Sequence, residues 1–415
     1  MCCNDAGKGP RGGPRGACVH APRRVRERGP GHGLCTTGRV SSDERVSGSS
    51  VVPGAVAPPG LAALLGELFP GEEMRAVEPL SPDAAPRAGA TGKAAGYGAP
   101  LRIVLAGPGG AERVLVFRTA TANEFGHDRR SDRAQVMLLA YDTFSSMPRH
   151  VRALDVGAVG ADGRLVSLRG SGEIYLLTTW APGRIYAEDL RAVAAAGAAT
   201  ALDLARCTAL ARWLAELHRA RGGTPGAYVR AVRDLVGSGE GLFGIVDSYP
   251  ADTPAAPPAR LQEIERQCLA WRWRLRGCAG RLRRTHGDFH PFNVLFSAGE
   301  DFTLLDASRG GWGDPADDVT AMVVNYVFFA AEQRAAWRGL GPLWRRFWAE
   351  YLSASGDGGL LDVCAPWLAW RVAVVADPRF YPGLSAAARD LLLRLAESAL
   401  AAPRFDPAMA EALFE

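Results

Sequence analysis

The spacing of apolar residues changes near residue 180. Before it, short apolar runs bounded by glycine, proline or polar residues occur at Leu101–Leu105, Arg113–Arg118 and Val151–Val159, which is typical of strands. After it, apolar residues recur every three or four positions, which indicates amphipathic helices. The pattern therefore predicts a strand-rich part followed by a helix-rich part, an α+β protein.

The strand-rich part also contains helical patterns. Leu61–Phe69 and Asp132–Phe144 have apolar residues at helical spacing, and further strands are expected at Leu165–Leu168 and Ile174–Trp180. A glycine run at 107–110 separates the first two strands. It could cover nucleotide phosphates, but it lacks the G-x-G-x-x-G motif. The absence of this motif favours a plain hairpin loop.

The second part is expected to be mostly helical. Its first helix ends near His218, which we interpret as a packing or capping residue rather than a catalyst. Trp271 and Trp273 are interpreted as core or cleft-wall residues rather than a nucleic-acid stacking surface. The expected helices are Leu202–Arg219, Tyr228–Leu235, Leu261–Leu275, Val319–Ala330, Trp337–Leu352, Val363–Val375 and Ser385–Ala401.

Composition separates a basic leader from the body of the chain. Residues 1–58 are rich in Gly, Arg, Pro and Ser and have no apolar periodicity, so we expect them to be disordered. The chain of 415 residues has a formal net charge of +4, but residues 1–50 hold nine Lys or Arg against four Asp or Glu. The body is therefore near neutral, which argues against a nucleic-acid-binding protein. A non-folding extension is favoured over a basic arm, and 80–100 is expected to be a linker.

Cysteine usage and hydropathy indicate the compartment. Four of the eight cysteines lie in the leader, and the other four are isolated, with no C-x-x-C pair. No stretch reaches 18 consecutive apolar residues, and the leader lacks the apolar region of a secretory signal. We expect a cytoplasmic protein with no membrane association.

One segment, from Thr285 to Thr320, concentrates the candidate chemistry. It contains His286-Gly287-Asp288, then Asn293 five residues after the aspartate, then two short apolar runs joined by a glycine turn, then Asp306. Two such runs predict a hairpin with Asp288 and Asn293 at its start and Asp306 at its end, close together in space. Carboxylate and carboxamide oxygens suit a hard cation such as Mg²⁺ and leave one carboxylate as a base.

Two other interpretations of this segment are possible. Asp288 and Asp306 could be ordinary turn and strand-end carboxylates. Alternatively, His286, Asp288 and His290 could be the alternating metal ligands of a hydrolase strand. The second is disfavoured because Pro291 interrupts strand pairing and because it gives Asn293 and Asp306 no role.

The pattern H-G-D-x-x-x-x-N followed by Asp306, Gly313-Asp314-Pro315 and Asp318 resembles the aminoglycoside phosphotransferase and choline kinase-like family of the protein-kinase-like superfamily. The resemblance implies a two-lobed protein-kinase-like fold with a small β-rich N-terminal lobe and a larger helical C-terminal lobe. We expect these lobes at 59–180 and 181–415.

The resemblance also implies roles for single residues. Asp288 would accept or orient the proton of the substrate hydroxyl, and Asn293 and Asp306 would hold Mg²⁺ against the nucleotide phosphates. His286 and Asp318 would support the catalytic loop.

The nucleotide side departs from the family pattern. Arg118 stands where the family has a lysine, and Asp132 or Gln135 stands where it has a glutamate. Trp180 and Ala181 would form the hinge that meets the adenine, although a plain strand-to-helix turn fits them equally well. Arginine is longer and planar and does not simply replace lysine.

Together these features predict a phosphotransferase that uses ATP (or GTP) and Mg²⁺ to phosphorylate a hydroxyl group of a small molecule. The alternative is a nucleotide-binding pseudokinase that acts through partner contacts. The complete set of Asp288, Asn293 and Asp306 favours the enzyme, whereas Arg118 favours the pseudokinase.

Overall fold

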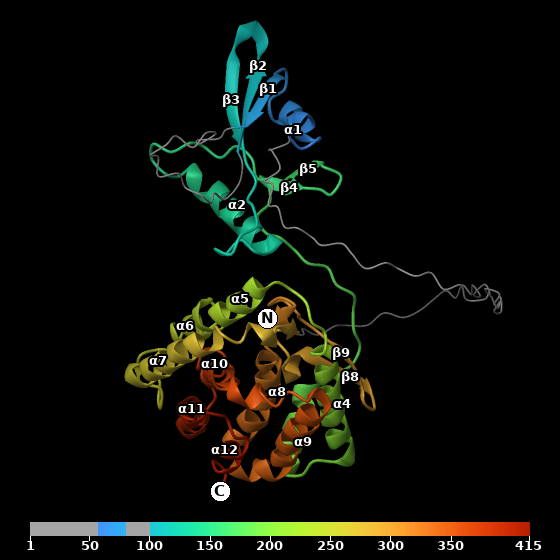
Figure 1. Cartoon of the computed structure of the whole chain (residues 1–415), viewed down its shortest axis with the longest axis vertical. Helices are drawn as coiled ribbons and strands as arrows, with labels where there is room; N and C mark the ends of the chain where they lie inside the picture. Colours follow the sequence, from blue (N-terminus) through green and yellow to red (C-terminus); the bar gives the residue numbers. More distant parts are fainter. Residues whose placement is uncertain (1–56, 80–99) are drawn as a thin grey trace, which may run out of the picture. The chain divides into compact units, whose positions relative to one another are not determined.

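The computed structural model describes residues 57–79 and 100–415 (Figure 1). All but the last two residues of the leader expected at 1–58 lie outside the described residues. The same holds for the linker expected at 80–100, apart from its final residue.

The first described element is α1 (Leu61–Leu68), which confirms the helix expected there. It precedes an antiparallel sheet with the order β1-β2-β3, formed by β1 (Glu73–Pro79), β2 (Leu101–Ala106) and β3 (Glu112–Phe117). The sequence pattern missed β1. Leu61 and Leu65 of α1 pack against Ile103 and Leu105 of β2 in a small core of their own.

The glycine run between β2 and β3 is the connection of this hairpin. It forms a short 3₁₀ turn, η1 (Pro108–Gly110), in which Gly109 and Gly110 have φ angles of 75° and 83°. Only glycine adopts such angles without strain, so the local backbone explains the run.

The rest of this part contains α2 (Arg130–Phe144), β4 (Gly157–Val159) and β5 (Leu165–Ser167). The strand expected at Val151–Val159 is reduced to its last three residues. The strand expected at Ile174–Trp180 is wrong, because the structure assigns no strand pairing there and Leu176 and Trp180 are 87% and 89% exposed. Apolar β-formers favour an extended backbone, but a strand also needs a hydrogen-bonded neighbour.

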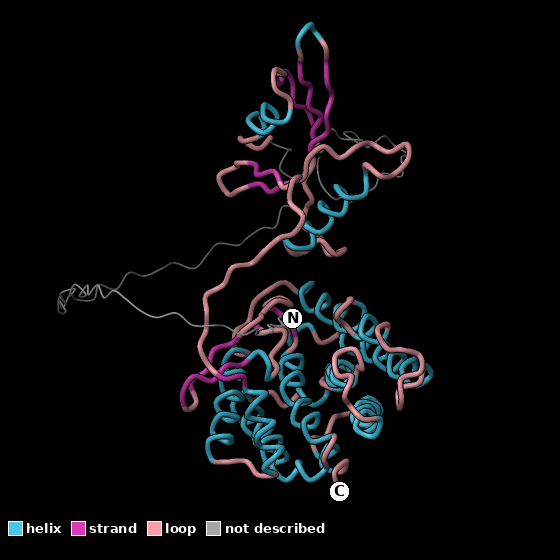
Figure 2. The backbone as a smooth tube through the Cα atoms, turned by 180° about the vertical axis from the view of Figure 1, so that it is seen from behind, coloured by secondary structure: helices cyan, strands magenta, loops and turns pink. Residues whose placement is uncertain are grey.

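Helices dominate after residue 185 (Figure 2). The seven expected helices are confirmed with shifts of a few residues at their ends, and α3, α6 and α12 were not expected. The helices are α3 (Tyr186–Ala196), α4 (Ala201–Leu217), α5 (Pro225–Gly237), α6 (Leu242–Val246), α7 (Pro258–Leu275), α8 (Pro315–Ala331), α9 (Trp337–Ser355), α10 (Ala365–Ala376), α11 (Ala386–Ala401) and α12 (Ala408–Glu411), with 3₁₀ turns η2 (Ala279–Arg281), η3 (Pro291–Asn293), η4 (Arg334–Ala336) and η5 (Leu360–Asp362).

Two small sheets interrupt these helices. Strands β6 (Arg184–Ile185), β8 (Val294–Ala298) and β9 (Asp301–Leu304) form an antiparallel sheet in the order β6-β8-β9. Strands β7 (Arg283–Arg284) and β10 (Trp312–Gly313) form an antiparallel pair. Strands β8, β9 and β10 lie within the Thr285–Thr320 segment, and β6 and β7 precede it.

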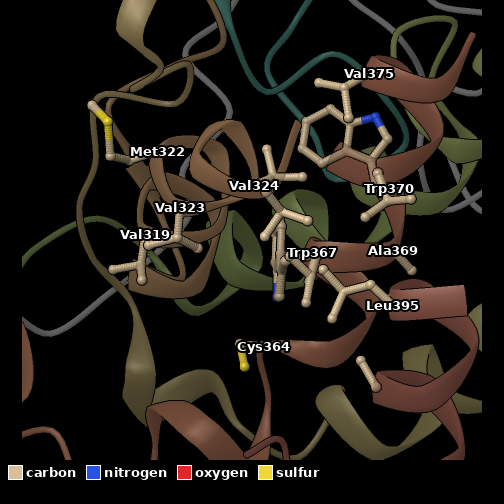
Figure 3. Packing of buried hydrophobic residues seen from close by; sticks show 14 of the residues in the cluster. Val319, Met322, Val323, Val324, Cys364, Trp367, Ala369, Trp370, Val375 and Leu395 are labelled. Atoms are coloured by element: carbon tan, nitrogen blue, oxygen red, sulfur yellow. The ribbon is translucent and has the colours of Figure 1, made fainter. Parts of the chain in front are cut away.

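The helix-rich part has one extensive apolar core. Figure 3 shows a portion of it, with Val324 of α8, Trp367 of α10 and Leu395 of α11 in the same cluster. These side chains are at most 1% exposed. Burial of this extent fixes α8 and α10, which both carry residues of the candidate site.

The content of helices and strands agrees with an α+β protein, whereas the two-lobed arrangement and the domain limits stay predictions. Within residues 57–79 and 100–415, no helix has both the length and the apolar character needed to cross a membrane. The described cysteines, Cys207, Cys268, Cys278 and Cys364, are free thiols.

The two tryptophans of α7 provide a test of the core. Trp271 is 3% exposed and its indole N–H donates to the carbonyl oxygen of Leu400 at 3.0 Å, whereas Trp273 is 62% exposed. We expect Trp271→Ala to lower the free energy of unfolding by about 3–5 kcal/mol, because it removes a large buried side chain. Trp273→Ala should change it by no more than about 0.5 kcal/mol. Denaturant unfolding of both variants measures the difference, and equal effects would contradict this orientation of α7.

Candidate active site

The loop that begins at Thr285 is held by a buried carboxylate. Oδ2 of Asp318 accepts a hydrogen bond from the backbone N–H of His286, and Oδ1 accepts one from that of Gly287, both at 2.7 Å. Asp318 lies in the first turn of α8 and is fully buried. This is the geometry that the expected supporting role of Asp318 requires.

A second layer of contacts holds Asp318 itself. Nε2 of His218, the C-cap of α4, lies 3.1 Å from Oδ2 of Asp318, and Nδ1 of His218 lies 2.7 Å from the hydroxyl of Tyr351. All three side chains are buried. Both nitrogens of His218 have a hydrogen-bond partner when Nε2 carries the proton and donates to Asp318, and the tyrosine hydroxyl donates to Nδ1. The interpretation of His218 as a packing or capping residue therefore fits, but the sequence did not reveal this contact.

Glycine is required in the His-Gly-Asp sequence. Gly287 has a φ of 87°, and a Cβ atom at this position would lie 3.1 Å from the Cβ of Arg309. The left-handed backbone turns the chain so that Asp288 follows directly after the two anchored N–H groups. Nδ1 of His286 accepts a hydrogen bond from the N–H of Asp288 at 3.3 Å.

Basic side chains surround the carboxylate of Asp288. Its Oδ1 lies 2.8 Å from Nη1 of Arg371 and 3.6 Å from Nη1 of Arg309, and its Oδ2 lies 3.4 Å from Nε2 of His290. Burial raises the pKa of the Asp288 carboxyl, but the hydrogen bond from His290 and the charges of Arg371 and Arg309 outweigh it and hold the pKa well below its usual range. Asp288 is therefore ionised at neutral pH.

The sequence pattern did not indicate Arg371 as a site residue. Its one available signal was a single charged residue within the apolar run Ala365–Ala376. Besides Asp288, Arg371 contacts Oδ1 of Asp317, at 2.5 Å, and the carbonyl oxygen of Gly287, at 3.1 Å. Burial raises the pKa of the Asp317 carboxyl, and the charge of Arg371 offsets this only in part.

The hairpin β8–β9 brings Asn293 and Asp306 to the same end. Val294 pairs with Leu304, and the N–H of Leu305 donates to the carbonyl oxygen of Asn293 at 2.9 Å. Asp306 is the next residue and has a φ of 53°, a left-handed conformation that aspartate tolerates better than most residues. The prediction that the hairpin brings Asn293 and Asp306 to one end is thus confirmed.

The oxygens at this end of the hairpin fit a magnesium site. Nδ2 of Asn293 donates to the carbonyl oxygen of Asp288 at 3.0 Å, which leaves Oδ1 for a cation. The Asp306 carboxylate is exposed and makes no hydrogen bond within the described part of the chain. The described residues contain no cluster of three or more His, Cys, Asp or Glu suited to a metal ion. Magnesium does not need one, because it is usually held by one or two carboxylates together with phosphate oxygens.

The residues expected on the nucleotide side lie outside this cluster. Arg118 comes directly after β3, is exposed, and lies with its guanidinium 5.2 Å from the ring centre of Phe144. It forms no ion pair with any described carboxylate, and Asp132 caps its own helix by accepting the N–H of Arg129 at 2.7 Å. Trp180 is exposed and Ala181 is partly buried, both in an irregular segment. Their nucleotide-binding roles stay predictions.

Comparison with known proteins identifies the class. Residues 148–350 match the model of the phosphotransferase enzyme family (APH), a segment just under half the length of the chain that includes Asp288, Asn293, Asp306 and Asp318. The resemblance inferred from the His-Gly-Asp segment is therefore confirmed as a match of residues 148–350 to the phosphotransferase enzyme family. No curated protein sequence matches the chain significantly.

Several solved structures also match the chain. Choline kinase from Cryptosporidium parvum Iowa II is 10% identical, with coverage of 85% of this chain and 92% of that one and a TM-score of 0.30. Macrolide 2'-phosphotransferase from Brachybacterium faecium is 14% identical, with coverage of 83% and 98% and a TM-score of 0.27. A glucosamine kinase is 15% identical, with coverage of 86% and 97% and a TM-score of 0.30. At these values the matches do not indicate a substrate.

Replacement of Asp318 tests the anchoring of the loop. Asp318→Asn places an amide where two backbone N–H groups and His218 need an acceptor, so at least one buried donor loses its partner. We expect the free energy of unfolding to fall by about 1–3 kcal/mol. Denaturant unfolding measures this loss. Unchanged stability would mean that the loop does not depend on the carboxylate.

Proposed function

We propose that this protein is a kinase that uses Mg²⁺ and ATP (or GTP) to phosphorylate a hydroxyl group of a small molecule. The observation that carries the proposal is the fixed, ionised Asp288 on a loop whose hairpin continues to Asn293 and Asp306. The match of residues 148–350 to the phosphotransferase family supports the same reaction class.

In this proposal, Asp288 orients the acceptor hydroxyl. A bond forms between the hydroxyl oxygen and the γ-phosphorus while the bond from that phosphorus to the leaving nucleoside diphosphate breaks, and the hydroxyl proton passes to Asp288. Because the pKa of Asp288 is held low, the carboxylate is a weak base. It would therefore act mainly by orientation and accept the proton late, as a loose transition state allows.

Two side chains would hold the metal. The Oδ1 atom of Asn293 and the carboxylate of Asp306 supply oxygen ligands, and Mg²⁺ when bound neutralises charge on the nucleotide phosphates. Arg118 would grip the phosphates in place of the family lysine, and Trp180 and Ala181 would meet the adenine.

The acceptor would bind in the pocket beside the loop. On the helix-rich side, Trp312, Trp367 and Trp370 line this pocket together with the carboxylates of Asp234, Glu240 and Asp317. Each of these carboxylates is paired with an arginine, in the pairs Asp234–Arg230, Glu240–Arg309 and Asp317–Arg371. Paired carboxylates attract cations weakly, so the pocket supports a neutral acceptor, such as a sugar-like polyol, better than a polycation.

The second candidate function is a pseudokinase, favoured by Arg118 in the position of the family lysine. A thermal-shift screen separates the two, with ATP or GTP and Mg²⁺ tested against a panel of sugars, amino sugars, amino alcohols and nucleosides. An enzyme should be stabilised by one nucleotide and further by its acceptor, and should then convert that acceptor to a phosphate ester. Stabilisation by nucleotide without any transfer would favour the pseudokinase.

Asp288→Asn tests the orienting carboxylate. The amide keeps the shape but cannot accept the proton, so we expect phosphoryl transfer to fall by about 10²–10⁴-fold. The affinity for the Mg²⁺–nucleotide complex should stay nearly unchanged. Steady-state kinetics and nucleotide titration measure the two quantities, and equal rates in mutant and wild type would remove Asp288 from the mechanism.

Asp306→Ala tests the metal site. The variant should lose the part of nucleotide stabilisation that depends on Mg²⁺, because the phosphates lose their bridging cation. Melting temperatures with nucleotide, with and without a chelator, provide the measurement. Asp301→Ala, which removes an exposed carboxylate from the same hairpin, is the matched control. If Asp306→Ala keeps the Mg²⁺ effect, Asp306 is only a strand-end carboxylate.

A further inference from the structure

Arg371 is the one charged residue of α10, a helix that is otherwise apolar. It is 5% exposed and packs among core residues of the helix-rich part. Taking a charge out of water costs several kcal/mol, so a buried arginine is stable only where anionic or carbonyl groups surround it. The anionic and carbonyl groups around Arg371 are therefore the groups that its charge interacts with.

Within the described part of the chain, its hydrogen-bond acceptors all belong to the loop that begins at Thr285 or to α8, the helix that anchors this loop. Nη1 donates to Oδ1 of Asp288 at 2.8 Å, and Nη2 donates to the carbonyl oxygen of Gly287 at 3.1 Å and to Oδ1 of Asp317 at 2.5 Å. One guanidinium thus connects the side chain of Asp288, the backbone just before it and the first turn of α8.

The arginine is itself held in place. Its Cζ lies 3.9 Å from the ring centre of Trp370, and the indole N–H of Trp370 donates to the carbonyl oxygen of Glu240 at 2.8 Å. A planar cation stacked on an anchored aromatic ring has few alternative rotamers. The guanidinium therefore restricts the position of the Asp288 carboxylate, and its own position does not depend on that carboxylate.

Resting on the proposed function, we propose that Arg371 is a positioning residue that fixes the carboxylate of Asp288 for the acceptor hydroxyl. It does not touch the reacting atoms. It acts through Asp288, because one oxygen of that carboxylate is held by the fork and the other is left near His290 to face the acceptor. A reacting group displaced by 1 Å can cost about 10²-fold in rate.

The role needs arginine and not only a positive charge. The planar guanidinium bonds Asp288 through one terminal nitrogen and both Gly287 and Asp317 through the other. A lysine ammonium at the end of a flexible stem cannot reproduce that geometry. Arg371→Lys should therefore restore only part of the function that Arg371→Met removes.

The experiment uses the full chain and transfer to water, so that the acceptor need not be known. Hydrolysis of Mg²⁺–ATP and Mg²⁺–GTP is measured for wild type, Arg371→Met, Arg371→Lys and Arg389→Met. Arg389 is the matched control, because it is 3% exposed but, among the described residues, donates only to the carbonyl oxygen of Ala376, away from the loop. We expect kcat to fall about 10²-fold in Arg371→Met, with KM for the nucleotide changed by less than about threefold.

The dependence on Asp288 gives a sharper test. If Arg371 acts through that carboxylate, Arg371→Met should reduce kcat strongly in wild type but hardly at all in an Asp288→Asn background. If Arg371 had only a structural role, Arg371→Met would lower the stability of both backgrounds and would reduce kcat by the same factor in each.

The two proposals fail in different ways. A wild-type chain that transfers no phosphoryl group to water or to any acceptor would overturn the proposed function and the role of Arg371 with it. The positioning role alone would be overturned if the wild-type chain is active and folded Arg371→Met has the same kcat or a higher one. Equal losses in Arg371→Met and Arg389→Met would do the same.

Discussion

The candidate site depends on one buried carboxylate. Asp318 accepts the backbone N–H groups of His286 and Gly287 and contacts Nε2 of His218, and it lies in the first turn of α8, where the helix dipole favours negative charge. Because α8 is buried along most of its length, the loop is fixed to the core of the helix-rich part and not to a mobile surface. The position of Asp288 follows from this attachment.

Around Asp288 the protein combines charges that a plain core would exclude. The carboxylates of Asp288 and Asp318 and the guanidinium of Arg371 are almost removed from water. Replacement of such a charged group by an apolar one often stabilises a fold. Local rules of this kind are broken mostly at functional sites, where an exact arrangement of charges matters more than stability. The left-handed backbone of Asp306 is a second departure of this kind, in the same segment.

Contacts within the structure define the acceptor side of the site more fully than the nucleotide side. Asp288, Asn293 and Arg371 are linked by hydrogen bonds that follow one another through the loop. Arg118 and Trp180 are exposed, and no described carboxylate pairs with Arg118. Their roles depend on sequence resemblance, whereas the arrangement around Asp288 is defined by contacts within the structure.

The sequence alone determined those features that local chemistry controls. Periodicity located the long helices, glycine spacing located the hairpin, and the spacing of Asp288, Asn293 and Asp306 indicated a candidate site, because all three lie on one short connected segment. The tertiary structure alone decided the rest. The strand expected at Ile174–Trp180 has no partner there, and Arg371 reaches Asp288 from a helix more than 80 residues along the chain. Pairing and burial join residues that are distant in sequence, so no local pattern specifies them.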